Sequence, residues 1–494
     1  MPDSPLPAGS VVIVTSPDKA LSAALARSAA PKPKEEPKEV TTSHVLARGS
    51  AAIPYDATVG TLTVKRGEAT GTMFYTAYRR TDVGDATGRP LLFAFNGGPG
   101  SASLWLHMGV FGPARVSLDV DDLRPPPWVA EPNPDSLLDR ADLVFVDPIG
   151  TGWSKAEGEG KEFYSVEGDV ESVAEFVRQY VAKHGRWGSP ILLAGESYGT
   201  TRCAGLAQHL ADKHGLAVRG LVLLSVALKF DTLLFGPNNV LPPVLLLPTC
   251  AATAHYHGLI TGDLPALLAE VETFALDTYL PALVRGGRLA PAERRALAEQ
   301  IAGYIGVSAD FVERCNLRPT LMRYCKELLR DRRRTVGRLD SRFTGVDRDA
   351  GGDSIEHDPS LSFLMGPYTA AYHHHLRHSL GWEEDAAYAP LSLDVNRGWS
   401  WEPHVNQYVD VTERLRSALV ANPHLEVFAG SGLYDMATPY FATDYTLAQV
   451  GWEPELADRM VHESYAAGHM MYLHPPSLDK LRADLDRWLD RLGL

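Results

Sequence analysis

The sequence has few cysteines and no long apolar run, and these two scarcities exclude several classes of protein. Only four of its 494 residues are cysteine, and no two of them form a Cys-x-x-Cys pair. A disulfide scaffold and a structural zinc site are therefore poorly supported, although Cys315 and Cys325 could pair in an oxidising compartment. The best candidate for a membrane span, residues 244–254, contains Pro248 and falls short of about 18 apolar residues. We expect no association with a membrane.

Positive charge is also scarce. Lysine and arginine number 47 against 61 aspartates and glutamates, which gives a formal net charge of −14. A surface with this excess of negative charge is not attracted to nucleic acid, so we expect no nucleic-acid partner. The N-terminus has no basic region followed by a long apolar segment, as a secretory signal would. We therefore expect a cytoplasmic protein.

Changes in composition along the chain predict four parts. The first is a polar tail that contains Pro-Lys-Pro-Lys-Glu-Glu-Pro-Lys-Glu at positions 31–39, which cannot bury apolar surface. Two parts of an α/β core follow, separated by a mainly helical insertion, or lid, that opens with a run of prolines. The predicted boundaries are 1–45 for the tail, 46–235 and 396–494 for the core, and 236–395 for the insertion.

The core is expected to hold a mostly parallel sheet with helices on both faces. Alternating patterns around residues 59–63 and 73–77 predict two half-buried antiparallel strands. Later strands are apolar on both faces, as strands covered by helices on both sides are. These runs lie at 91–95, 143–146, 191–194, 221–224 and 425–430.

The strongest chemical signal is Gly195-Glu196-Ser197-Tyr198-Gly199, which has the Gly-x-Ser-x-Gly pattern of a nucleophile elbow. An apolar strand precedes it and a helical pattern follows, which is the context that this motif requires. Small residues at both glycine positions allow a sharp turn that holds the serine hydroxyl above the sheet. We expect Ser197 to be a nucleophile.

A serine hydroxyl needs a base, normally a histidine that a carboxylate orients. In this architecture the chain order is serine, acid, histidine. Asp435 follows an apolar strand, and His469 lies after a glycine just before the last helix. Asp444 and Asp458 compete with Asp435 but do not lie at a strand end. We therefore expect Asp435 and His469 to complete a triad.

A glycine-rich turn, Asn96-Gly97-Gly98-Pro99-Gly100, follows the buried strand 91–95. Backbone N–H groups of such a turn can stabilise a developing oxyanion, together with the amide of the residue after the nucleophile, here Tyr198. The turn and the elbow together predict an oxyanion hole.

These motifs resemble those of the serine carboxypeptidases, peptidase family S10, which includes carboxypeptidase Y and cathepsin A. The resemblance also covers Asp147-Pro148-Ile149-Gly150-Thr151-Gly152-Trp153-Ser154 and extends, in the family's order, over roughly residues 55–490. It implies an α/β-hydrolase fold with a helical insertion and an oxyanion hole from the Gly98 and Tyr198 amides. The low cysteine count and the missing signal peptide suggest a bacterial-type member.

The resemblance also implies a site for the free C-terminal carboxylate of a peptide substrate. The family binds this group through residues that match Asn96, Gly97 and Glu196. A glutamate that faces a carboxylate must be protonated in order to donate a hydrogen bond, so acidic pH is expected to favour peptide binding. Eukaryotic members place a second glutamate where this chain has Val110, and many have cysteine where it has Ser101.

The predicted function is a serine carboxypeptidase that works through an acyl-enzyme intermediate and needs no cofactor. The triad alone equally fits an esterase or an acyltransferase, and a non-catalytic binding protein is a third reading. The histidines at 373–375 and His378 resemble a metal cluster but have no carboxylate nearby in the sequence, so we expect no metal site. The sequence does not decide the oligomeric state, and a homodimer is one of the possibilities.

Overall fold

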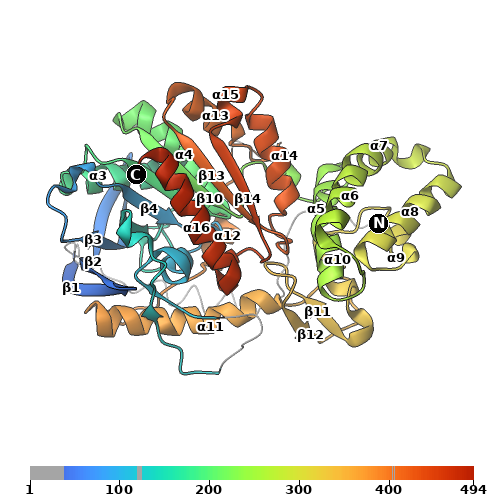
Figure 1. The fold of residues 1–494 in the computed structure, drawn as a ribbon, viewed down its shortest axis with the longest axis horizontal. Coiled ribbons are helices and arrows are strands. Elements are labelled where there is room, and N and C mark those ends of the chain that lie inside the picture. The colour runs from blue at the N-terminus through green and yellow to red at the C-terminus, as the bar shows by residue number, and fades with distance from the viewer. Residues whose placement is uncertain (1–37, 119–124, 403, 405–406) are drawn as a thin grey trace.

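The computed structural model describes residues 38–118, 125–402, 404 and 407–494, and a ten-stranded sheet forms its centre (Figure 1). The spatial order is β1-β2-β3-β7-β4-β9-β10-β13-β14, with β8 paired to β3. From β7 to β14 all neighbouring strands are parallel, whereas β1, β2 and β3 form antiparallel pairs up to β7. The strands are Glu39–Arg48 (β1), Ala51–Arg66 (β2), Ala69–Arg80 (β3), Leu91–Phe95 (β4), Asp142–Val146 (β7), Lys155–Ala156 (β8), Ile191–Glu196 (β9), Val218–Leu224 (β10), Glu426–Gly432 (β13) and Met460–Tyr465 (β14).

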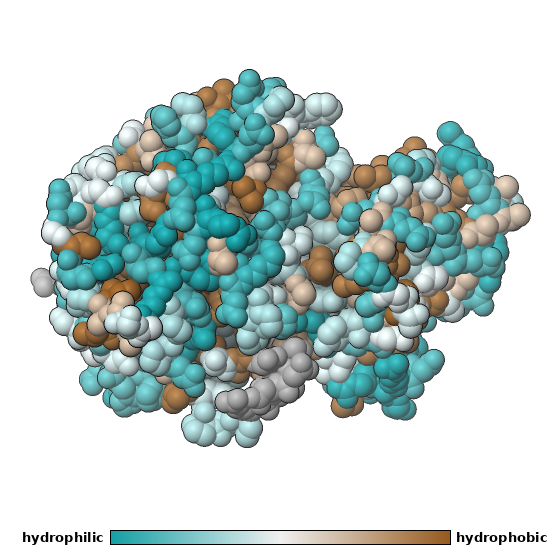
Figure 2. All heavy atoms as spheres, in the orientation of Figure 1, coloured by the Kyte–Doolittle hydropathy of each residue, from teal (hydrophilic) through white to brown (hydrophobic). Residues whose placement is uncertain are grey.

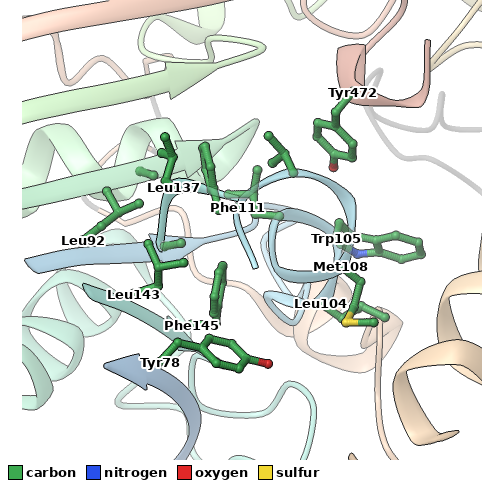
Figure 3. Close-up of a cluster of buried hydrophobic side chains, with 14 of the residues drawn as sticks. Tyr78, Leu92, Leu104, Trp105, Met108, Phe111, Leu137, Leu143, Phe145 and Tyr472 are labelled. Carbon is green, nitrogen blue, oxygen red and sulfur yellow. The ribbon is translucent and has the colours of Figure 1, made fainter. Parts of the chain in front are cut away.

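Helices cover both faces of this sheet, because its central strands are apolar on both sides. Every residue of β4, β7 and β9 is buried. One face packs against α3 (Val166–Lys183), α4 (Tyr198–His214) and α13 (Thr412–Ala421). The other packs against α16 (Pro475–Leu492), α11 (Pro359–His374) and the short α2 (Leu104–Leu106), and Figure 3 shows part of this second cluster. The predicted layered α/β core is confirmed.

A helical lobe with its own apolar cluster lies beside the sheet, at the right of Figure 1. Tyr434 and Met436, which follow β13, belong to the same cluster and tie the lobe to the core. Figure 2 shows an indented outline between the two bodies and mainly hydrophilic residues over the sheet body. The helices of the lobe are Leu241–Tyr256 (α5), Leu264–Phe274 (α6), Leu280–Arg285 (α7), Pro291–Ile305 (α8), Ala309–Arg314 (α9) and Leu321–Glu327 (α10).

The predicted insertion, residues 236–395, does not form one unit. Helix α11 packs against the sheet body, where Leu364 and Tyr368 belong to the same apolar cluster as α16. The segment between the lobe and α11 carries a two-stranded sheet of Arg334–Val336 (β11) and Thr344–Val346 (β12). The remaining helices are Leu393–Gly398 (α12), Tyr440–Val450 (α14) and Pro454–Ala457 (α15).

The boundary predicted for the tail is wrong. The tail was expected to reach residue 45, but β1 begins at Glu39 and pairs with β2 along its whole length. Its polar composition suits an edge strand, because only one long side and one face of such a strand are covered. Residues 1–37 lie outside the described residues.

All four cysteines are buried and free, so Cys315 and Cys325 do not pair. Within the described ranges, no helix combines the length and the apolar character that crossing a membrane requires.

A buried ion pair joins α3 to α4 and gives a test of the core. The Arg202 guanidinium lies 2.8 Å from Asp169 and also donates to the Asn96 carbonyl. Asp169→Ala would leave the charge of Arg202, which is 1% exposed, buried without its partner. We expect the free energy of unfolding in urea to fall by about 3–5 kcal/mol.

Asp310→Ala is the control, because that carboxylate pairs with Arg295 on the surface. Its urea midpoint should match that of the unsubstituted protein. Equal losses in the two variants would contradict a structural role for the buried pair.

Candidate active site

The residues around Ser197 form a sharp turn between β9 and α4. Ser197 has φ 59° and ψ −128°, a backbone conformation that residues other than glycine rarely adopt. A Cβ atom on Gly195 would lie 2.3 Å from the Gly199 carbonyl oxygen, and one on Gly199 would lie 2.5 Å from the Phe95 oxygen. The glycines are therefore required by close backbone contacts. The turn holds Ser197 at the carboxyl end of the parallel strands.

Asp435 and His469 come together across two neighbouring strands. Asp435 follows β13 and His469 follows β14, and Oδ2 of the aspartate lies 2.6 Å from Nδ1 of the imidazole. The Ala437 and Thr438 amides donate to Oδ1 at 2.8 and 3.1 Å, and the Thr438 hydroxyl donates to Oδ2 at 2.5 Å. These donors fix the carboxylate, which in turn sets the plane and tautomer of the ring.

The surroundings of His469 favour its charged form. The residue is 5% exposed, and burial by itself lowers the pKa of an imidazole. The charge and hydrogen bond of Asp435, with the charge of Glu196 as a smaller contribution, outweigh burial and raise the pKa of His469 above its ordinary value. An imidazole in this setting is a good proton acceptor.

Ser197 and His469 line one pocket, of about 150 Å³. Within the described part of the chain, the Ser197 hydroxyl makes no hydrogen bond to the imidazole. Such bonds are often long in free enzymes and tighten when substrate binds. Of the three residues predicted as a triad, Ser197 and His469 thus line a single pocket, and the acid Asp435 is in contact with the imidazole.

The glycine-rich turn lies against the nucleophile elbow. A Cβ atom on Gly97 would lie 2.5 Å from the Tyr198 nitrogen and 2.7 Å from the Glu196 carbonyl oxygen. Among the described residues, neither the Gly98 N–H nor the Tyr198 N–H has an acceptor. Two unpaired amides next to a serine hydroxyl are the donors that an oxyanion hole requires.

Asn96 and Glu196 form a buried polar cluster in the same pocket. The Asn96 side-chain amide donates to Oε1 of Glu196 at 2.8 Å, and its oxygen accepts from the Leu106 amide at 3.0 Å. The Tyr472 hydroxyl donates to Oε2 at 2.7 Å. Burial raises the pKa of Glu196 to about 7, against the opposing effects of His469 and of these two donors. Glu196 is therefore substantially protonated in mildly acidic solution.

Tyr472 was missed by the sequence analysis. Its hydroxyl reaches Glu196 beside the helical segment His107–Phe111, which contains Val110, and Figure 3 shows its ring near Trp105. A Cβ atom on Gly109 would lie 2.3 Å from Cε2 of Tyr472, so that glycine makes room for the ring. Tyr472 thus supplies a second side-chain hydrogen bond to Glu196, beside the one from Asn96.

A segment between β11 and α11 supports the histidine loop, and nothing in the sequence indicated this. The Leu339 carbonyl accepts from the His469 amide at 2.7 Å. Asp340, itself paired with Arg342 at 2.6 Å, accepts from the Gly468 amide at 3.2 Å. The position of His469 therefore depends on residues far from the triad in sequence.

The histidine cluster considered as a metal site has separate neighbours. His375 lies 3.3 Å from the Tyr78 hydroxyl, His373 packs against Trp153, and His374 packs against His378. No group of three or more metal-ligating side chains suited to a metal ion is found among the described residues.

A family model described as serine carboxypeptidase matches residues 51–320, more than half of the chain. The chain belongs to the serine carboxypeptidase family. Serine carboxypeptidase-like 5 of Arabidopsis thaliana is 32% identical over 111 residues, which is 22% of this chain and 25% of the relative. Serine carboxypeptidase-like 13 of the same plant is 28% identical over 137 residues, 27% of this chain and 31% of the relative. These matches thus span about a quarter to a third of the relatives' length.

A solved carboxypeptidase has a similar fold. The crystal structure of Kex1(Δ)p, a prohormone-processing carboxypeptidase from Saccharomyces cerevisiae, gives a TM-score of 0.56 at 16% identity. The match covers 89% of this chain and 92% of that one. The predicted α/β-hydrolase fold is confirmed.

The hydrogen bond from Tyr472 predicts how Glu196 titrates. In Tyr472→Phe the charged carboxylate loses a donor, so the pKa of Glu196 should rise above its value of about 7. Infrared difference spectra across pH would follow the protonated carboxyl band, assigned by its loss in Glu196→Gln.

Tyr368→Phe is the matched control, because the Tyr368 hydroxyl is buried near the same ring and has no hydrogen-bond partner in the described residues. It should leave the titration of Glu196 unchanged. A downward shift in Tyr472→Phe would contradict the assignment.

Proposed function

We propose that this chain is a serine-type carboxypeptidase that hydrolyses C-terminal residues from peptides through an acyl-enzyme intermediate. The observation that carries the proposal is the Asn96–Glu196 pair in the pocket that also holds Ser197 and His469. A buried protonated glutamate and an amide can hold a substrate's terminal carboxylate and so place the last peptide bond at the serine. An esterase has no need for such a pair.

In the proposed mechanism His469 removes the Ser197 proton as the hydroxyl attacks the scissile carbonyl. The Gly98 and Tyr198 amides stabilise the oxyanion, and Asp435 stabilises the imidazolium. The imidazolium then protonates the departing amine. A water molecule, deprotonated by His469, next attacks the acyl-enzyme ester, and Ser197 leaves as the acyl group is released. We also propose that the chain is a bacterial-type member, which its four free cysteines support.

The decisive comparison is between a blocked dipeptide with a free C-terminal carboxylate and the same dipeptide as its C-terminal amide. The amide cannot offer the negative charge that Glu196 and Asn96 would bind. A hydrogen bond to a charged group contributes about 1.5–3 kcal/mol, so kcat/KM should favour the acid roughly ten- to hundredfold.

Faster turnover of the amide would remove the carboxypeptidase proposal and leave an esterase or another peptidase. A fluorophosphonate probe supplies the control for a competent nucleophile, since it should label the protein but not Ser197→Ala. No labelling of either protein would favour a binding protein without activity.

The pH dependence should separate peptides from esters. A neutral Glu196 is present below its pKa of about 7 and is lost as the pH rises through that value. The free base form of His469 is gained as the pH rises, so peptide kcat/KM should be bell-shaped while ester hydrolysis keeps only the rising limb.

Glu196→Gln tests the origin of the falling limb, because a carboxamide donates hydrogen bonds at every pH. Peptide hydrolysis by this variant should lose the limb near pH 7. A wild-type peptide profile that is flat from pH 5 to pH 8 would rule out the role given to Glu196.

A further inference from the structure

Among the described residues that line the active-site pocket, Arg338 is the one lysine or arginine. It belongs to the segment between β11 and α11, which the sequence analysis did not connect with the site. Glu196 is the only carboxylate among these described lining residues, and its burial favours the neutral form. Arg338 therefore brings a guanidinium group to the pocket of this acidic protein.

The backbone of Arg338 is held on both sides. Its amide donates to Asp358 at 3.1 Å, and its carbonyl accepts from the Met436 amide at 3.1 Å. The next residue accepts from the His469 amide. Arg338 is thus fixed beside the loops that carry Asp435 and His469.

The Arg338 side chain has little to hold it. Its Nε forms an ion pair with Oδ2 of Asp358 at 3.8 Å, which is beyond hydrogen-bond distance, and the side chain is 39% exposed. That carboxylate already accepts from the Arg338 and Leu339 amides and from the amide and hydroxyl of Ser360. Within the described ranges, the Arg338 guanidinium donates no hydrogen bond. Its planar set of donors is available to a ligand.

Strand order separates the terminal-carboxylate site from the histidine loop, which the segment of Arg338 contacts through Leu339. Asn96 follows β4, which lies on one side of β9, and Glu196 ends β9 itself. His469 follows β14, which lies beyond β10 and β13 on the other side. A peptide whose last carboxylate occupies the Asn96–Glu196 pair therefore extends its preceding residue toward the side of Arg338.

We propose that Arg338 binds the side-chain carboxylate of the residue just before the scissile bond, and so gives the enzyme a preference for glutamate there. This inference rests on the proposed function. Leu339, Leu361 and Ala437 line the same pocket and offer apolar contact to the methylene groups of that side chain. An arginine and a carboxylate form paired, charge-assisted hydrogen bonds, which glutamine cannot match.

The test compares four blocked dipeptides with free C-termini at pH 6: Glu-Phe, Gln-Phe, Phe-Glu and Phe-Gln. The substrate glutamate is ionised at this pH. The unsubstituted enzyme should favour Glu-Phe over Gln-Phe by about tenfold in kcat/KM, and the ratio should shrink in high salt. In Arg338→Gln the ratio should fall to about one.

Arg348→Gln is the matched control, because Arg348 is an exposed arginine paired with Glu356 and absent from the pocket lining. It should keep the tenfold ratio. If Arg338→Gln lowers the hydrolysis of Glu-Phe and Gln-Phe equally, Arg338 only stabilises the His469 loop, and the proposal is overturned. A change in the Phe-Glu to Phe-Gln ratio instead would also overturn it, since the carboxylate would then belong to the leaving residue.

Binding separates failure of this inference from failure of the proposed function. Calorimetric titration of Ser197→Ala with Glu-Phe and Gln-Phe should give dissociation constants that differ by about tenfold, and Ser197→Ala/Arg338→Gln should abolish the difference. If these binding differences are found but the unsubstituted protein hydrolyses neither peptide, the carboxypeptidase proposal is refuted, whereas recognition of the glutamate side chain by Arg338 is supported. Equal binding of both peptides by Ser197→Ala would refute the recognition.

Discussion

The whole site depends on how closely the backbone that leaves β4 approaches the backbone that leaves β9. Phe95 pairs with Gly195 in parallel register, so the two strands end side by side. No Cβ atom fits at Gly97, because the Tyr198 nitrogen would lie 2.5 Å away. This contact brings the candidate oxyanion donors, the nucleophile and the Asn96–Glu196 pair into one pocket. Each of these groups depends on glycine where a side chain would force the strand ends apart.

Much of this arrangement could be predicted from the sequence, because the signals were local. Strands buried on both faces read as unbroken apolar runs, and the elbow follows such a run at Ile191–Glu196. The same logic placed Asp435 after its strand, whereas His469 was predicted from its glycine neighbour and its position before the last helix. The structure brings the two within 2.6 Å. Parallel strands deliver the residues that follow them to one edge of the sheet, so order along the chain carried spatial information.

Contacts between segments that are distant in sequence and carry no recognisable motif could not be predicted. Tyr472 reaches Glu196 across 276 positions of the chain, and only the space left at Gly109 makes the contact possible. Arg338 and Asp340 approach the histidine loop from the segment before α11, which composition alone assigned to a lid. The edge strand β1 was missed because one long side and one face of it are exposed, so its sequence contains no apolar run. Its polar residues resemble those of a tail.

Glu196 and His469 have linked protonation states, and this link shapes the proposed chemistry. Each charge affects the other, since the imidazolium lowers the pKa of Glu196 and the carboxylate raises the pKa of His469. The active form needs a protonated glutamate and a neutral imidazole, and moving that proton to His469 leaves the total number of protons unchanged. The balance between these two forms is therefore set by the surroundings and not by pH. Under the proposed function, a substrate carboxylate beside Glu196 would repel its ionised form and draw the proton back, so that peptide binding would free the imidazole to act as a base.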